Sequence, residues 1–175
     1  MKELDQSVST SSKRPTPGVS GLLVIHSAPS ALRTHIEWGI QSILGAHVAL
    51  TWKSQPMSAG TYRTSLSFRT PRSVVPKIAS ALRNWHYLRF EVREESLDGG
   101  EIYRATPELG MHRAVIDGLG SIMVNESQIL TAMENSFDEE SLRFALGKVL
   151  GTAWDEELEP YRGVELQEVL SLKAI

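Results

Sequence analysis

The stretch GLLVIHSAPSALRTHIEWGIQSILG, residues 21–45, decides the fold that we predict. Residues 21–26 form a continuous apolar run of strand length, which predicts a strand buried on both faces. The hydroxyl and proline residues at 27–30 predict the start of a helix, and Gly45 predicts its end. The apolar side chains of this helix recur every three to four residues, as in a helix that packs on a sheet; they are Leu32, Ile36, Ile40, Ile43 and Leu44.

The pattern of strand and helix then repeats. Alternating apolar residues predict strands over 48–52, 62–68 and 88–94, and a helix from Ser73 to Trp85 separates the last two. We expect Ser73 to cap this helix and Pro76 to lie in its first turn. The order βαββαβ is that of a ferredoxin-like arrangement, in which one antiparallel sheet carries both helices on one face.

Residues 98–175 extend this ferredoxin-like half, which we assign to residues 18–97. Strands over 101–106, 111–117 and 121–125 are separated by glycine-containing turns and predict a β-meander. A short helix is predicted over 127–133, and residues 136–139 match a capping box that starts a longer helix. We therefore predict a single α+β domain over residues 18–175, with a ferredoxin-like βαββαβ sheet that a C-terminal meander and helices extend.

The composition excludes several classes of protein. The 175 residues contain no cysteine, which excludes a disulfide scaffold, a zinc–thiolate site and cysteine catalysis. The net charge of −3 argues against a non-specific DNA-binding protein. Residues 1–17 are polar, so we expect a disordered arm, and with no long apolar run we expect a cytoplasmic protein without a membrane span. We find no metal-ligand spacing and expect no cofactor.

The acidic block TAWDEELEPYRG, residues 152–163, is the most unusual part of the sequence. We expect Gly151 to end one helix and Thr152 to begin a short one that Pro160 and Gly163 close. Clustered carboxylates can bind a cation, transfer protons or receive an arginine. The interpretation that we prefer is structural: a capped helix with its tryptophan in the core and its arginine paired. The candidate residues are Trp154, Asp155, Glu156, Glu159, Tyr161 and Arg162.

Four further residues are secondary candidates. His26 ends the first strand where a helix N-terminus could hold an anion, and His35 lies on the flank of that helix. Arg63 and Arg89 are expected on the open face of the sheet, while the strand aromatics face the helices, so the parts needed to stack RNA bases are not together. Because the first strand is apolar on both faces, the open face needs a cover, and we expect the C-terminal helices or a second subunit there.

Several segments carry a family resemblance. They are GLLVIHSAPS, HIEWGI, ALRNW, LRFEV and, most specifically, GTAWDEELEPYRG at residues 151–163. In these segments the chain resembles an uncharacterised family of actinobacterial conserved hypothetical proteins, classed as a domain of unknown function. The resemblance implies a bacterial cytosolic protein and assigns no catalytic role to any residue.

Three functions are compatible with these observations. We rank first a non-enzymatic binding or assembly module that self-associates and binds a small molecule or a protein. The second is an enzyme or small-ligand binder that uses the block Asp155–Arg162 with His26 or a sheet arginine. The third, a weak nucleic-acid binder through basic sheet residues, is disfavoured by the net charge and by the position of the aromatic residues.

Overall fold

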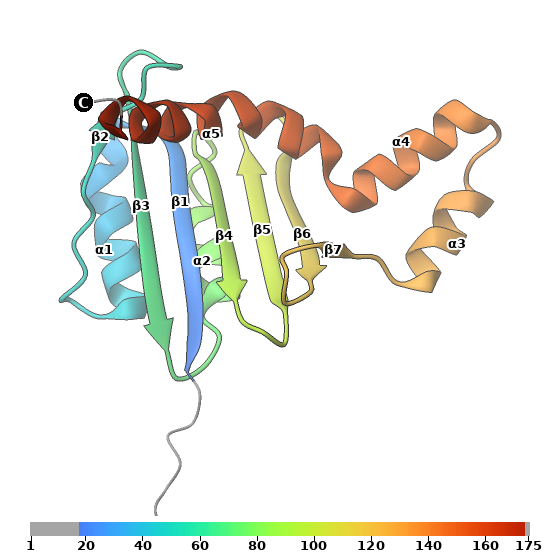
Figure 1. The fold of residues 1–175 in the computed structure, drawn as a ribbon, viewed down its shortest axis with the longest axis horizontal. Helices are drawn as coiled ribbons and strands as arrows, with labels where there is room; N and C mark the ends of the chain where they lie inside the picture. The colour runs from blue at the N-terminus through green and yellow to red at the C-terminus, as the bar shows by residue number, and fades with distance from the viewer. Residues whose placement is uncertain (1–17, 174–175) are drawn as a thin grey trace, which may run out of the picture.

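The computed structural model describes the backbone of residues 18–173 and the side chains as far as Val164. The arm predicted for residues 1–17 lies outside the described residues. The described chain has an α+β fold built on one seven-stranded antiparallel sheet, in the order β2-β3-β1-β4-β5-β6-β7. Figure 1 shows two helices behind this sheet and a long helix across its front.

The strands are β1 (Val19–Pro29), β2 (Lys53–Ser54), β3 (Thr61–Thr70), β4 (Arg89–Glu95), β5 (Gly100–Thr106), β6 (Gly110–Ile116) and β7 (Ile122–Met123). The helices are α1 (Arg33–Leu44), α2 (Val75–Leu82), α3 (Glu126–Glu134), α4 (Glu139–Leu150) and α5 (Thr152–Lys173), with a 3-10 turn at Ser30–Leu32. The meander predicted over 101–125 is therefore present as β5, β6 and β7.

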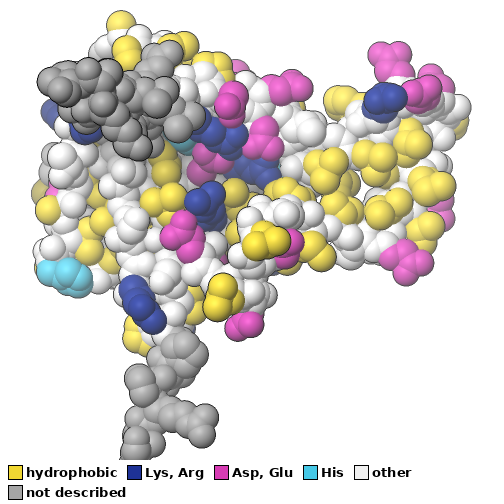
Figure 2. Space-filling model, viewed as in Figure 1, with side chains coloured by type: hydrophobic (Ala, Val, Ile, Leu, Met, Phe, Trp, Pro, Cys, Tyr) yellow, Lys and Arg dark blue, Asp and Glu magenta, His cyan; other side chains and the backbone are white. Residues whose placement is uncertain are grey.

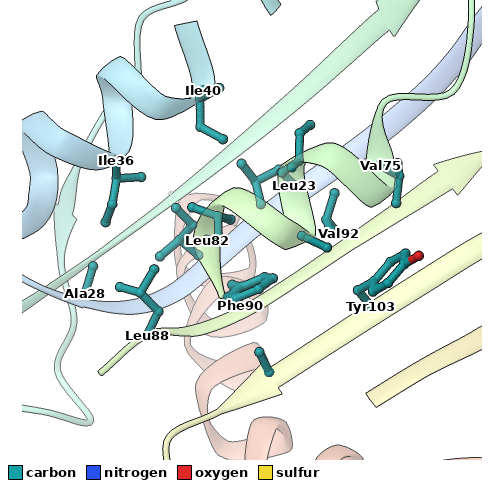
Figure 3. Close-up of a cluster of buried hydrophobic side chains, with 14 of the residues drawn as sticks. Leu23, Ala28, Ile36, Ile40, Val75, Leu82, Leu88, Phe90, Val92 and Tyr103 are labelled. Carbon is teal, nitrogen blue, oxygen red and sulfur yellow. The ribbon is translucent and has the colours of Figure 1, made fainter. Parts of the chain in front are cut away.

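The core lies between the sheet and the two helices behind it. The buried side chains of α1 and α2 pack against β1, β4 and β5, as Figure 3 shows; they are Ile36, Ile40, Val75, Ile78, Ala79 and Leu82. Their partners on the strands include Leu23, Phe90 and Val92, which are at most 1% exposed. This burial supplies the main stabilisation of the sheet, because each large apolar side chain removed from water contributes about 1.5–3 kcal/mol.

Some predicted boundaries were wrong. The strand predicted over 48–52 is irregular, and the edge strand β2 is confined to Lys53–Ser54. The Ser73 hydroxyl does not cap α2, because it donates to Glu94 instead. The capping box of α4 is formed by Asp138 and Ser141, two residues later than predicted, because the acceptor of Asp138 reaches the backbone N–H of Ser141.

The helix expected to close at Pro160 is the long helix α5, which continues to Lys173. A proline inside a helix removes one backbone hydrogen bond and usually ends the helix. Here Trp154, Leu158 and Val164 are buried on both sides of Pro160, and Pro160 itself is exposed. Packing of this face on the sheet therefore outweighs the local preference of proline. The end predicted at Gly151 is correct: α4 stops there in a left-handed turn with φ 76°.

The helices α3 and α4 form a hairpin that extends away from the edge of the sheet at β7 (Figure 1). Gly151 and α5 connect this hairpin to the sheet and its two helices, here called the body. The last helix then crosses the open face of the sheet and contacts β1 and β5. The expectation that a C-terminal helix covers this face is therefore confirmed at one end of the sheet.

Candidate functional site

A row of one valine and three polar residues crosses the open face of the sheet beneath α5. The strand registers pair Val24 with Glu91, Glu91 with Arg104, and Arg104 with His112, so these four side chains follow one another across β1, β4, β5 and β6. Residues that pair directly across antiparallel strands project from the same face. The pairing thus assembles charges from segments far apart in the sequence.

His26 lies on the same face as this row, next to an irregularity in β1. The register of β1 with both neighbours shifts just after Ile25, which is in the core, and Ala28 returns to the core. A β-bulge re-aims the side chains around it. His26 follows Leu22 and Val24 on the open face by simple alternation, and its Nε2 lies 2.7 Å from Oε2 of Glu91.

The first three turns of α5 add an acid and a base to the row. Asp155 and Arg162 are seven residues apart, two helical turns, and so lie on the same face of α5. The Arg162 guanidinium donates to both carboxylate oxygens of Glu91 and, at 2.9 Å, to Oδ1 of Asp155. It also donates to the exposed Glu159 at 3.3 Å. Arg162 therefore ties α5 to β4.

Arg104 occupies the junction between α4 and α5. Its side chain is only 2% exposed and donates to Oδ2 of Asp155 at 2.5 Å and to the carbonyl oxygens of Leu150 and Gly151. The last carbonyls of a helix have no partner within that helix, and cations are favoured there. Asp155, in the first turn of the next helix, is favoured by the same dipole argument. Arg104 thus donates hydrogen bonds both to the last carbonyl groups of α4 and to Asp155 in the first turn of α5.

His112 completes the support of this junction. Its Nε2 lies 3.0 Å from the carbonyl oxygen of Val149, and its ring packs on Trp154 at 4.9 Å between centroids. Burial lowers the pKa of His112, so the neutral ring is favoured and its Nε2–H can donate to that carbonyl. Trp154 is buried, as predicted, and its indole N–H donates to the carbonyl of Gly110.

Glu91 is the electrostatic centre of the cluster that it forms with His26, Arg104, Asp155 and Arg162, here called the charged cluster. Burial alone would raise the pKa of Glu91, but hydrogen bonds from His26 and Arg162 outweigh it and lower the pKa to about 2. Glu91 therefore remains ionised at neutral pH, and its negative charge holds the cluster together.

The charged cluster forms one end of a cavity of about 570 Å³ on the open face. The remaining wall and floor are mostly apolar, from Leu22, Val24, Ile102 and Ile122, with Arg93 beside them. Figure 2 looks onto this face and shows basic and acidic side chains gathered below α5 with apolar side chains next to them. The lining contains three arginines and two carboxylates, so arginine charges exceed carboxylate charges by one.

The comparison with protein families covers this site. A family model described as a protein of unknown function, DUF3145, matches residues 22–171. The chain belongs to this family. The matched range contains the whole charged cluster and the block at 151–163 that carries the resemblance. The searches found no similar protein among curated proteins and no similar solved structure.

The structure separates the other predicted candidates from this cluster. His35 is exposed on α1, on the far side of the sheet, with its edge on the ring of Trp38. Glu156 is exposed and points away from the paired side chains. Arg63 is buried at the β2 side of the sheet. None of these three lines the cavity.

Arg89 and Tyr161 belong to a second group, at the N-terminal end of β4. Arg89 donates to Glu157 at 3.2 Å and to Glu108, and its guanidinium lies 5.1 Å from the centre of the Tyr161 ring. Since Arg89 is neutralised here, it is not available to a phosphate backbone in the way that a nucleic-acid-binding face requires.

Sequence reasoning missed Glu91 and Arg104. The alternation of Phe90 and Val92 does place Glu91 on the open face, so a signal for it existed. Arg104 lies in a predicted strand whose face could not be assigned without its partners. Among the described residues no group of three histidine or acidic side chains is arranged to hold a metal, and no helix there has the length and apolar content to span a bilayer.

Proposed function

We propose that the protein is a small binding module whose cavity on the open sheet face holds a small amphipathic anion. The observation that carries the proposal is the division of one cavity into an apolar floor and a charged end. Ligand sites are typically concave, about 300–1,000 Å³ in volume, mostly apolar, and contain a few polar groups that orient the ligand. The cavity of about 570 Å³ falls within this range.

The charge of the lining favours an anion over a cation. Asp155 and Glu91 are already engaged by arginines, whereas within the described residues Arg93 pairs with the half-exposed Glu95 alone, at 3.2 Å. Exposed pairs of this kind contribute little and exchange partners readily. A carboxylate on the ligand would therefore be attracted to Arg93 and Arg162 while its apolar part lies on Val24 and Ile122.

A second feature supports recognition of an acceptor group. Arg104 lines the cavity, and its Nε–H has no hydrogen-bond partner in the described part of the chain. A buried donor without a partner costs on the order of 1–3 kcal/mol. A ligand oxygen that reached this donor would recover that cost and would gain orientation as well as affinity.

Binding is also the role that best suits the acid of the cluster. A proton-transferring carboxyl needs a pKa near the working pH. The pKa of Glu91 is about 2, so this carboxylate stays charged and acts as a fixed anchor for His26 and Arg162. We infer that the acidic block contributes to a preorganised binding site through Asp155 and Arg162.

We also infer that β1 to β4, with α1 and α2, form a ferredoxin-like unit that carries this site. The strand order β2-β3-β1-β4 with antiparallel pairs supports it, as does the position of both helices on one face. The open face of such a unit is left available, and the meander strands widen it.

Titration with straight-chain carboxylates from butanoate to decanoate tests the proposed function, with alkyl ammonium ions of equal length as the comparison. We expect saturable NMR shifts at the methyl groups of Val24 and Ile122 with the carboxylates and several-fold weaker binding of the ammonium ions. Arg93→Gln should reduce this preference for the anion, because it removes the excess positive charge.

A filling variant supplies the control. Val24→Phe places a large side chain in the cavity and should abolish binding, whereas Ser67→Phe, on the same sheet face but outside the lining, should not. The absence of saturable shifts for every chain length, or binding that survives Val24→Phe, would contradict the proposal.

A further inference from the structure

The hairpin of α3 and α4, residues 125–150, is here called the helical arm. Six large apolar side chains on it are between 38% and 99% exposed. They are Ile129, Leu130, Met133, Phe137, Phe144 and Leu150. Figure 2 shows apolar side chains over much of the surface of this part of the molecule. Monomeric proteins rarely expose a contiguous apolar patch of this kind, so the arm is a candidate contact surface.

Internal packing does not account for the stability of the arm. Ala132 is the single buried residue of α3, and α4 has none, although their lengths are nine and twelve residues. Helices this short are marginal in water, and packing of an apolar face normally stabilises them. The arm therefore lacks a covering surface that its helices need.

The exposed area matches what a stable complex requires. A large side chain offers on the order of 200 Å² when fully exposed, so the six together offer on the order of 700 Å². Stable protein complexes bury about 800 Å² on each partner. The arm alone supplies nearly the whole of one such surface.

The arm also contains both halves of a self-complementary contact. A groove of about 640 Å³ runs between the two helices, and its lining includes the small residues Ala132 and Ala145 together with Phe144 and Val149. At the tip, Phe137 is 99% exposed and projects from the turn between the helices. A two-fold contact requires the same patch to present a projection and a recess.

Charge favours an antiparallel pairing of two arms. The tip carries Glu134, Asp138, Glu139 and Glu140, against which Arg143 is the basic residue, paired with Glu139 at 2.8 Å. Nearer the body, Lys148 is exposed and lines the groove. Glu140 and Lys148 have no ion-pair partner in the described part of the chain. In an antiparallel pair each acidic tip lies beside the partner's Lys148.

We propose that the helical arm pairs with the arm of a second copy of this chain, antiparallel about a two-fold axis. The tip residue Phe137 of each copy enters the groove of the other, and Glu140 of each meets Lys148 of the other. This contact places the two cavities on the bodies at opposite ends of the dimer, and it does not depend on the ligand proposed above.

Light scattering over a range of micromolar concentrations tests the pairing. We expect twice the 19.4 kDa mass of one chain, and a single-chain mass for Phe144→Glu. Leu119→Glu is the matched control, because Leu119 is equally apolar and 93% exposed but lies in the turn before β7. A single-chain mass for the unaltered protein would overturn the proposal, as would a dimer that persists in Phe144→Glu.

A charge exchange tests the antiparallel geometry. Lys148→Glu and Glu140→Lys should each weaken the dimer at least tenfold, because like charges then face one another across the axis. An equimolar mixture of the two variants should restore a heterodimer, since both facing pairs are again of opposite sign. Circular dichroism confirms that each variant is folded. A mixture that associates no better than the separate variants would overturn this geometry.

Discussion

The charged cluster and the helical arm differ in how their side chains are satisfied within the chain. In the cluster, polar and charged side chains come from β1, β4, β5 and α5, and each finds partners within the molecule. In the arm, apolar side chains remain exposed and no partner lies within the described chain. The charges of the cluster are paired within the chain, whereas the apolar surface of the helical arm is not covered by any described part of it.

The two regions also differ in whether the neighbouring sequence or the tertiary packing determines their structure. Both arm helices begin with capping boxes, formed by Asn125 with Gln128 and by Asp138 with Ser141, so neighbours in sequence define where they start. The cluster has no such local signal: Glu91 meets Arg162 only because the sheet and α5 are already packed. Local signals can thus form an element without providing a surface to bury it.

The largest expected effect contrasts an aromatic residue from each region. Trp154→Ala should lower the free energy of unfolding by about 3–5 kcal/mol, because it opens a cavity and leaves the Gly110 carbonyl unpaired. Phe144→Ala, in the arm, should change it by less than about 0.5 kcal/mol at concentrations where the chain is monomeric. Urea unfolding monitored by circular dichroism gives both values. Similar losses for the two variants would remove the distinction between the regions.

Glu91→Gln should have the next largest effect. It leaves Arg162 and His26 without their shared carboxylate, and removing one partner of a buried ion pair costs about 3–5 kcal/mol. Glu95→Gln is the control, because the Glu95–Arg93 pair is half exposed on the same strand and should cost less than about 1 kcal/mol. Chemical unfolding at neutral pH measures both.

The cost of Glu91→Gln should depend on pH. The pKa of Glu91 is lowered from 4.5 to about 2, so its stabilising contribution is complete above pH 4.5 and is lost as the pH falls towards 2. The two proteins should therefore converge in stability as the pH falls through this window. A difference that stays constant down to pH 2 would show that the charge of Glu91 is not the source of the stabilisation.

The smallest effect is expected at Glu157, in the second group beside Arg89. Burial raises the pKa of Glu157, and a hydrogen bond with Glu108 adds to it, so ionisation of this carboxyl opposes folding as the pH rises. Glu157→Gln should therefore raise the free energy of unfolding at neutral pH by less than about 1 kcal/mol and have no such effect in acid. The change is measured as a small rise in melting temperature at neutral pH. A clear loss at neutral pH would mean that the pair with Arg89 dominates.

The sequence predicted much of the fold but only parts of the site. Alternation identified the core residues Phe90 and Val92 and the helix stripe through Ile36 and Ile40, because each face of these elements meets a different environment. The prediction of a strand over 48–52 was wrong, because these residues alternate in polarity but have no neighbouring strand to pair with. Pairing is a property of two segments, and one segment's pattern does not contain it.

The same limit applies to the charged cluster. Asp155 and Arg162 could be singled out because they stand in an unusual local block, and His26 because it ends a buried strand. Their common partner, Glu91, is 65 and 71 residues from His26 and Arg162, and the register that places it between them depends on three strands. Local patterns therefore single out three members of this cluster, but neither Glu91 and Arg104 nor the assembly of the five.

Arg104 contacts both regions, because it lies at the junction of α4 and α5 and also lines the cavity. Gly151 is left-handed, and a Cβ there would lie 2.7 Å from the ring of His112, so the direction in which the arm leaves the body is narrowly defined. Arg104, which holds the Gly151 carbonyl, also lines the cavity. We therefore expect that a cavity occupant that redirected this guanidinium would also change the angle of the arm, and that arm pairing would in turn bias the guanidinium. Such reciprocity is thermodynamic coupling, in which each event changes the affinity of the other by the same factor.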